Sequence, residues 1–396
     1  MKIIKSLPHI FILLLFPFLI NAQEKIVIGQ KYTIYSNVLG EERAVWVYLP
    51  SDYYDTTYAP QKYPVMYLLD GDSHFHSMTG IHQFLSKGVS ASVPQMIIVG
   101  ILNTDRARDL TPTNSYEPEK GERYTFKTSG GNRKFISFLE KELMPVIKKK
   151  YRTNGYKLFV GHSFGGLTVL NTLLTRNDLF NAYVAIDPSI WWDNNYILKE
   201  AANKLSNNNF EGKTLFLAQA QKRIIEQDTT TEHQKAIMSF KYELDKNPKN
   251  GLRWQYKYFE DEDHGSVPLQ AEYYGLKYIY EGFQSEIKMV AQYPELLTLA
   301  YASISEKLKF ELKPSESLID WLGNYCLNND RKENAMVFFN LNKELYPESH
   351  NVYIRLGDVL KNSGNKEAAI SQFQKAIDLK PQSDFAKENL EELRDY

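Results

Sequence analysis

The sequence contains a single cysteine, Cys326. One thiol cannot form an intrachain disulfide, and a zinc site built on cysteines is excluded as well. The folded chain must therefore be stabilised by a hydrophobic core. A chain of 396 residues, 43 % of them hydrophobic, is long enough to bury one.

An excess of charge of either sign is also missing. The 47 basic and 48 acidic residues leave a formal net charge of -1. Proteins that bind nucleic acid or an anionic membrane surface carry basic surfaces. We therefore expect no nucleic-acid partner.

Long hydrophobic runs are scarce, and the most continuous one, residues 10–20, lies near the N-terminus. Lys2 and Lys5 precede it, and Ala22 offers a small residue for cleavage. This order is typical of a secretory signal peptide, and the run is too short and too interrupted by Pro17 to span a membrane. We predict a signal peptide over residues 1–22, export to the periplasm or the medium, and no membrane span in the mature chain.

Short apolar runs separated by helix-like patterns fill the next part of the chain. The expected helices include residues 133–150 and 269–283. Such alternation predicts an α/β domain over residues 23–285 with a doubly wound, mostly parallel sheet. Aromatic and polar residues alternate in the last run, which places it nearer the sheet edge. The expected strands are residues 45–50, 63–69, 95–101, 156–160, 182–186, 214–218 and 253–259.

The motif Gly161-His162-Ser163-Phe164-Gly165-Gly166 lies between one of these strands and a helix-like segment. G-x-S-x-G in that setting predicts a strained turn that exposes the serine hydroxyl beside the first N–H groups of a helix. Ser163 is therefore the candidate nucleophile, and His162 is the variable residue of the motif.

A serine nucleophile needs a general base, and His264 is the best-placed histidine because it follows the last expected strand. The histidines at positions 74, 76 and 82 fit no zinc spacing, and we expect them in loops or lining a pocket.

The acid that orients the histidine should follow the strand at 214–218. Asp228 is the favoured candidate and Glu226 the alternative, with Glu232 further on. Asp187 follows an earlier strand and is less suitable. A Ser-His dyad without an acid remains open.

The oxyanion hole should combine two backbone N–H groups. One belongs to Phe164, the residue after the nucleophile. The other comes from the turn after the strand at 63–69, and we assign it to Asp72.

The C-terminal part of the chain contains an internal repeat. Residues 34 positions apart match in kind, including Gly323 with Gly357 and Phe339 with Phe373. This period is that of tetratricopeptide helix pairs. We predict connecting helices over residues 286–314 and a small all-α, tetratricopeptide-like domain with a capping helix over 315–396. It would dock on the preceding domain and provide either a partner-binding groove or a packing and self-association module.

Several segments together resemble the "putative esterase" family of the α/β-hydrolase superfamily. This family includes enterochelin esterases and their periplasmic relatives, S-formylglutathione hydrolases, mycolyltransferases, and feruloyl or acetylxylan esterases. The resemblance covers about residues 30–283 and rests on the segments 67–71, 103–112, 161–166, 188–192 and 263–266.

The resemblance implies a serine esterase without metal or organic cofactor, in which Ser163 and His264 are nucleophile and base. The residues it places around the substrate pocket, together with His162 of the motif, are Arg106, Trp191 and Trp192. Family members often carry a carboxylate soon after the strand at 214–218. Here residues 219–222 read Gln-Ala-Gln-Lys, which leaves the acid open.

The sequence thus predicts a carboxylic-ester hydrolase that acts through an acyl-enzyme on a siderophore-like or other small or aryl ester. Alternatives with the same chemistry are a feruloyl or acetyl esterase on polysaccharide side chains and an acyltransferase. An alternative of another class is an inactive hydrolase fold that binds partners through its repeats.

Overall fold

The computed structural model of the chain describes residues 25–115, 126–221 and 232–395. Within these ranges the first part of the chain forms an eight-stranded sheet in the order β1-β2-β4-β3-β5-β6-β7-β8. Strands β3 to β8 run parallel, whereas β1 and β2 pair antiparallel at one edge. The strands are β1 (Gln30–Ser36), β2 (Glu41–Tyr48), β3 (Tyr63–Leu68), β4 (Ile97–Ile101), β5 (Thr153–His162), β6 (Ala182–Ile186), β7 (Thr214–Ala220) and β8 (Arg253–Phe259).

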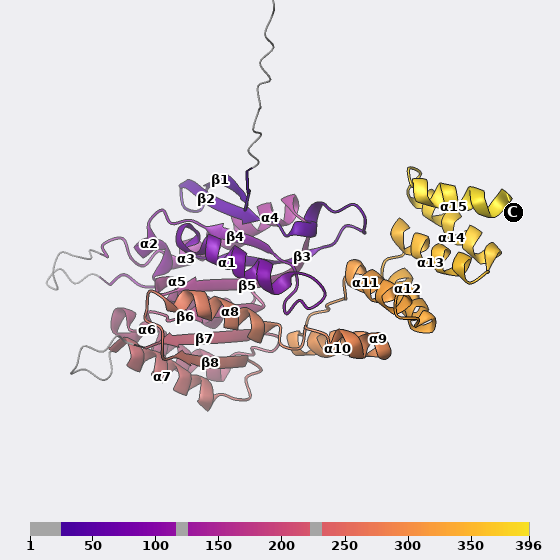
Figure 1. Ribbon diagram of the computed structural model, residues 1–396. Coiled ribbons are helices and arrows are strands. Elements are labelled where there is room, and N and C mark those ends of the chain that lie inside the picture. Colours follow the sequence, from indigo (N-terminus) through magenta and orange to yellow (C-terminus); the bar gives the residue numbers. More distant parts are fainter. Residues whose placement is uncertain (1–24, 116–125, 222–231, 396) are drawn as a thin grey trace, which may run out of the picture.

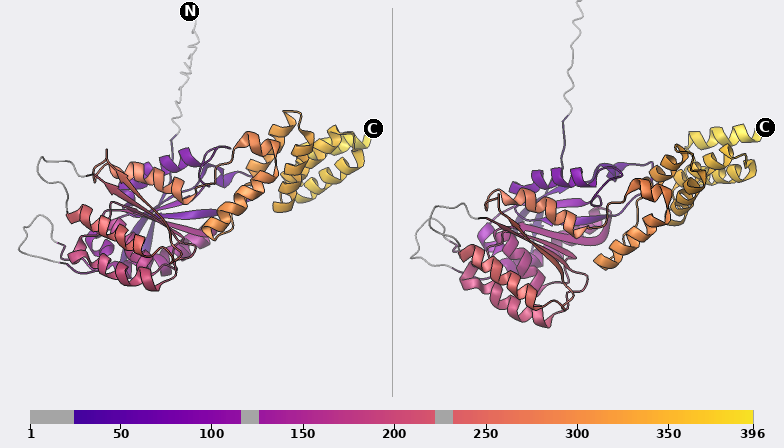
Figure 2. Two further views of the ribbon diagram at one scale, coloured as in Figure 1. Left: turned by 90° about the horizontal axis from the view of Figure 1, so that it is seen from below. Right: turned by 60° about the horizontal axis from the view of Figure 1, so that its bottom comes forward.

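Helices cover both faces of this sheet (Figures 1 and 2). One face carries α1 (Gly71–Ser86) and α8 (Val267–Ile279). The other carries α3 (Asn132–Phe138), α4 (Met144–Lys150), α5 (Phe164–Thr175), α6 (Trp192–Asn207) and α7 (Glu232–Lys246). The predicted doubly wound α/β fold is confirmed, and β8 is an edge strand as expected.

Strand β3 shows why the central strands read as continuous apolar runs. All six of its residues are buried. Successive side chains point to opposite faces, so Val65 and Tyr67 join the core under α5, and Met66 and Leu68 join the core under α1 and α8.

The helix expected over residues 133–150 is interrupted. A π-helical turn, Leu139–Leu143, separates α3 from α4. Pro145 lies in the first turn of α4 and has no N–H for the regular helical hydrogen bond, which explains the wider turn. Two shorter elements complete this part, the 3-10 helix Ser51–Tyr54 and α2 (Arg106–Leu110).

The C-terminal part is all helical and extends from one end of the sheet (Figure 1). It begins with α9 (Ile287–Gln292) and α10 (Glu295–Leu308). The two predicted repeats are the pairs α11 (Glu316–Leu327) with α12 (Lys332–Leu345) and α13 (His350–Asn362) with α14 (Lys366–Leu379), followed by α15 (Asp384–Asp395).

The same close contact recurs in both helix pairs. A Cβ atom on Gly323 would lie 2.4 Å from the ring of Phe339, and one on Gly357 would lie 2.8 Å from the ring of Phe373. Glycine therefore lets the two helices of each pair approach, and the recurrence explains the match 34 positions apart.

The segment expected to form connecting helices, residues 286–314, packs against both parts. Ile304 and Leu308 of α10 belong to the core under the sheet, whereas Leu297 and Tyr301 belong to the core of the repeats. None of the helices in the described ranges is long and apolar enough to cross a membrane.

Candidate active site

The turn between β5 and α5 places Ser163 in a strained conformation. Its φ of 59° and ψ of -116° lie outside the regions that non-glycine residues ordinarily adopt. A Cβ atom on Gly161 would lie 2.5 Å from the backbone of Gly165, so only glycine fits there. The turn thus has the geometry that the G-x-S-x-G motif predicts.

His264 follows β8 and lies beside this turn. Its ring centre is 4.5 Å from that of His162, the residue before Ser163. Its side chain is half exposed. The Nδ1 atom of His264 lies 2.6 Å from Oδ2 of Asp187.

Asp187 is the carboxylate that the structure brings to His264, although the sequence analysis ranked it lower. It follows β6, its side chain is 2 % exposed, and the N–H of Ala220 donates to its Oδ1 over 2.9 Å. Burial alone would raise the pKa of Asp187, but the contacts with His233, His264 and the Ala220 N–H bring it below the ordinary value. Asp187 is therefore an anion that can hold an imidazole.

The candidates favoured for this role fare differently. Asp228 and Glu226 lie outside the described residues. Glu232 is the first residue of α7, and its exposed carboxylate pairs with Lys235 over 3.0 Å. The carboxylate that contacts His264 in the described part of the chain follows β6, the strand that pairs with β5. The expectation of an acid after β7 stays a prediction.

A second histidine approaches the same carboxylate. Nε2 of His233, on the first turn of α7, lies 3.0 Å from Oδ2 of Asp187, an ion-pair distance without hydrogen-bond alignment. Asp187, His233 and His264 each offer a ligand atom, all within 4.8 Å of one another. The sequence analysis did not single out His233, because one histidine near a helix start carries no local signal.

Two helix starts converge at Ser163. Phe164 is the first residue of α5 and Asp72 the second residue of α1, positions whose N–H groups have no acceptor inside their own helix. A Cβ atom on Gly165 would lie 3.1 Å from Oδ2 of Asp70, the residue before α1. This contact places the start of α1 next to the start of α5, and the Phe164 and Asp72 N–H groups stay the predicted oxyanion donors. The Ser163 hydroxyl itself lies 3.2 Å from that of Ser189.

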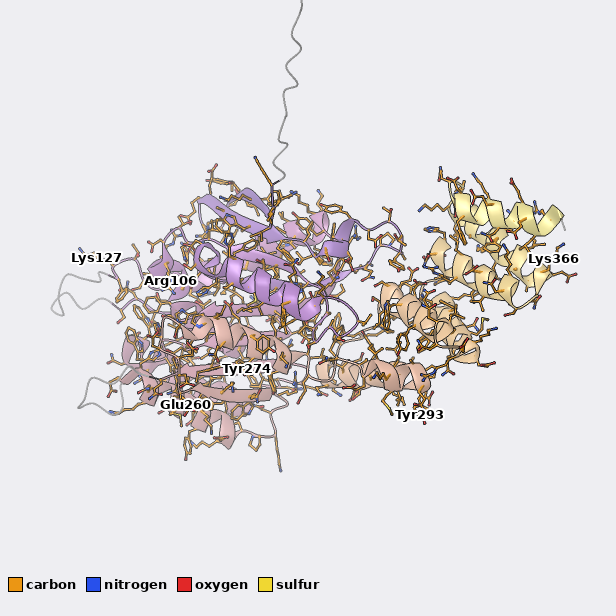
Figure 3. All side chains as sticks on the ribbon, viewed as in Figure 1. Arg106, Lys127, Glu260, Tyr274, Tyr293 and Lys366 are labelled. Atoms are coloured by element: carbon orange, nitrogen blue, oxygen red, sulfur yellow. The ribbon has the colours of Figure 1, made fainter. Side chains whose placement is uncertain are left out.

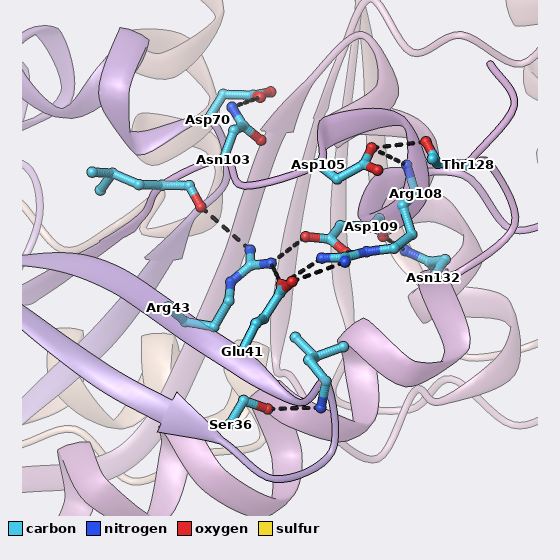
Figure 4. Close-up of polar contacts among 12 residues, drawn as sticks. Ser36, Glu41, Arg43, Asp70, Asn103, Asp105, Arg108, Asp109, Thr128 and Asn132 are labelled. Carbon is cyan, nitrogen blue, oxygen red and sulfur yellow. Dashed lines mark hydrogen bonds and ion pairs between the residues drawn. The ribbon is translucent and has the colours of Figure 1, made fainter. Parts of the chain in front are cut away.

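Arg106 lies at this end of the sheet, far from Lys366 in the repeats (Figure 3). Its guanidinium pairs with the Asp70 carboxylate through Nε at 2.6 Å and Nη2 at 3.0 Å. Asn103 donates to the same carboxylate over 2.8 Å (Figure 4). The charge of Arg106 is therefore already paired, although about a third of its side chain is exposed.

A second ion-pair network anchors the short helix that Arg106 begins. Arg43 and Arg108 both contact Glu41 and Asp109 (Figure 4). Asp109 is buried, and Arg108 also lies in α2. This network fixes α2 against β2 and hence the position of Arg106.

The two expected tryptophans differ. Trp191 is 38 % exposed, with its ring centre 6.3 Å from that of Phe164. Trp192 is 2 % exposed, and its Nε1 donates to Oγ1 of Thr113 over 3.1 Å. The expectation that Trp192 contacts substrate is therefore corrected, because its indole is part of the core.

The histidines expected in loops or lining a pocket lie on α1. His82 is buried and accepts the N–H of Met96 over 3.0 Å, whereas His76 is exposed. His74 packs edge-on to His162 with ring centres 5.7 Å apart. Burial, reinforced by the charges of His264 and His74, lowers the pKa of His162 to about 3. His162 is therefore a neutral ring beside the nucleophile.

A family model described as "Putative esterase" matches residues 36–264, the range that contains Ser163, Asp187 and His264. The chain belongs to this esterase family. A tetratricopeptide-repeat model matches residues 350–383, which contain α13 and α14.

Relatives of the esterase part carry related descriptions. The chain is 32% identical to "Ferri-bacillibactin esterase BesA" of Bacillus subtilis over 221 residues, 52% of this chain and 75% of the relative. It is 33% identical to "Siderophore enterobactin esterase" of Emericella nidulans over 154 residues, which are 36% of this chain and about half of that relative (51%).

Solved structures agree with the fold. An IroE-like serine hydrolase from Shewanella oneidensis has a TM-score of 0.72 and 32% identity, over 80% of this chain and 99% of its own. An uncharacterised protein from Capnocytophaga ochracea has a TM-score of 0.59 over 93% of this chain and 100% of its own. Its identity is 16%, so this second likeness concerns the fold alone.

Proposed function

We propose that this esterase is a serine carboxylic-ester hydrolase that cleaves siderophore esters through an acyl-enzyme. The observation that carries the proposal is the strained Ser163 turn with the His264–Asp187 pair beside it. A base held by a buried carboxylate beside a serine hydroxyl is the arrangement that activates serine for attack on an ester.

In this mechanism Ser163 Oγ attacks the ester carbonyl carbon while Nε2 of His264 accepts the hydroxyl proton. Asp187 at Nδ1 keeps the proton on that nitrogen and stabilises the imidazolium that forms. The N–H groups of Phe164 and Asp72 stabilise the oxyanion. The alcohol leaves with the proton from His264, and water then hydrolyses the acyl-enzyme by the same steps. For this cycle the hydroxyl must turn from Ser189 toward His264.

Two lines of support favour a siderophore ester. The relatives named above are described as esterases of ferri-bacillibactin and enterobactin. Beside the nucleophile, the exposed face of Trp191 offers a surface for an aromatic ring. The guanidinium of Arg106, although paired with Asp70, is partly exposed and lies 3.4 Å from the carbonyl oxygen of His162, where it adds a donor near the turn.

We extend the proposal to the two ends of the chain. Residues 1–22, which lie outside the described residues, would act as a signal peptide and direct the enzyme to the periplasm or the medium. The helix pairs α11–α14 with α15 would form a separate module, from about residue 315, that binds a protein or peptide or a second copy of the chain.

The test is labelling with a fluorophosphonate probe. Wild type and Ser189→Ala should be labelled, and Ser163→Ala should not. Unlabelled but folded wild type would contradict the serine mechanism and favour an inactive binding scaffold.

Substrate class is tested by measuring kcat/KM on a panel. It contains ferric and iron-free enterobactin, a feruloylated sugar, an acetylated xylan oligomer and a simple aryl ester. We expect the siderophore trilactones to give the highest values. A preference for the sugar esters, or acyl transfer to an added alcohol in place of hydrolysis, would overturn the siderophore assignment.

A further inference from the structure

Three side chains at the active site have the donor atoms of a metal site, although the proposed hydrolysis uses no metal. Asp187, His233 and His264 come from the ends of different elements and place one carboxylate oxygen and two ring nitrogens within 4.8 Å of one another. We propose that Zn²⁺ binds reversibly to these three residues and inhibits the enzyme.

The ligand atoms are close to the spacing that zinc requires. Tetrahedral bonds of about 2.0 Å place neighbouring ligand atoms about 3.3 Å apart. In the structure, Oδ2 of Asp187 lies 2.6 Å from Nδ1 of His264 and 3.0 Å from Nε2 of His233. Side-chain shifts of less than about 1 Å would thus admit the ion, with water as the fourth ligand.

The surroundings favour a cation. Asp187 is an anion whose Oδ1 is already fixed by the N–H of Ala220, so Oδ2 is oriented toward the two rings. Nε2 of His233 is buried and makes no aligned hydrogen bond within the described residues. The half-exposed ring of His264 gives the ion a path from solvent.

Zinc at this position would block catalysis through the tautomer of His264, a step that rests on the proposed function. As general base, His264 carries its proton on Nδ1 and has a free electron pair on Nε2. When zinc binds Nδ1, the ring's proton moves through solvent from Nδ1 to Nε2, and the electron pair freed on Nδ1 forms the metal bond. His264 can then no longer accept the proton of Ser163.

Binding is tested without activity. Titrating ZnCl₂ into the full-length Ser163→Ala variant in a calorimeter should show one site. Introducing His233→Gln or His233→Phe into this variant should lower the zinc affinity at least about tenfold, because one ligand is lost. Adding His76→Gln, which changes an exposed histidine on α1, should leave it unchanged. No binding up to about 1 mM, or equal binding in the His233 variants, would refute the site.

Inhibition is tested separately with an aryl ester. Zinc should inhibit wild type and His76→Gln, and EDTA should restore the rate. For each variant, inhibition is expressed as a fraction of its own zinc-free rate. On this scale the half-inhibitory zinc concentration of His233→Gln should be at least about tenfold higher than that of wild type. Binding without inhibition of an active enzyme would overturn the inhibitory role. If wild type hydrolyses no ester, the proposed function fails, whereas the calorimetric result still decides the metal site.

Discussion

Nδ1 of His264 lies 2.6 Å from Oδ2 of Asp187, although the two residues are 77 positions apart in the chain. Asp187 follows β6, inside the sheet, and His264 follows β8, at its edge. The loop after β8 therefore folds back over β7 to place the imidazole on this carboxylate. The consequence for catalysis can be tested directly.

Asp187→Asn should lower kcat by a factor on the order of 10²–10⁴ with little change in KM, because an amide no longer fixes the tautomer of His264. Steady-state kinetics on an aryl ester measures this. Asp228→Asn and Glu226→Gln serve as comparisons and should remain within a few-fold of wild type. If one of these two loses activity and Asp187→Asn does not, the acid is misassigned.

Gly161→Ala should destabilise the fold by about 2–3 kcal/mol, because its Cβ atom would lie 2.5 Å from the backbone of Gly165. The matched control is Gly80→Ala in α1, where a Cβ atom meets nothing within 4 Å. Gly80→Ala should stabilise the fold by about 0.5–1 kcal/mol, because alanine has a higher helix propensity than glycine. Urea unfolding measures both. Equal effects at the two positions would mean that Gly161 is not required by the turn.

Glu272 in α8 is buried next to Ser77 and His74, and burial raises its pKa to about 8. Between its ordinary value of 4.5 and about 8, the folded state holds a proton that the unfolded state has lost. Stability should therefore fall as the pH rises through this window, with a slope of up to about 1.4 kcal/mol per pH unit from this group.

Glu272→Gln should remove this contribution. We expect urea unfolding between pH 5 and 8.5 to show a shallower decline in the variant than in wild type. The exposed Glu286→Gln should follow wild type. Parallel curves for wild type and Glu272→Gln would show that the carboxyl group is ionised in the folded state.

The adjacent tryptophans should separate binding from stability. Trp191→Ala removes an exposed ring beside Phe164 and should raise KM for aromatic esters several-fold with little loss of stability. Trp192→Ala leaves a cavity in the core and should lower the free energy of unfolding by about 3–5 kcal/mol. Thermal unfolding combined with kinetics on aryl and acetyl esters distinguishes the two. A similar loss of stability in both variants would assign Trp191 to the core as well.

Local patterns predicted much of this structure. The nucleophile turn was predictable because strand, motif and helix are contiguous in the chain, and the repeats because Gly323 and Gly357 make the same contact with a phenylalanine. The partner of His264 was not, because the choice between carboxylates depends on how loops fold over the sheet edge. Asp187 did have a local signal, since it directly follows a buried strand and precedes Pro188.

The helical tail contacts the sheet domain at the end away from the active site. Glu316 of α11 accepts the N–H of Ala59 over 2.7 Å, and Asp320 accepts from the Tyr58 hydroxyl over 3.2 Å. Both contacts lie just before β3 begins, whereas Ser163 and Asp187 follow the carboxyl ends of β5 and β6 (Figure 1). A partner held by the outer helices would thus tether the enzyme with its catalytic edge facing away from the attachment point and open to diffusing substrate.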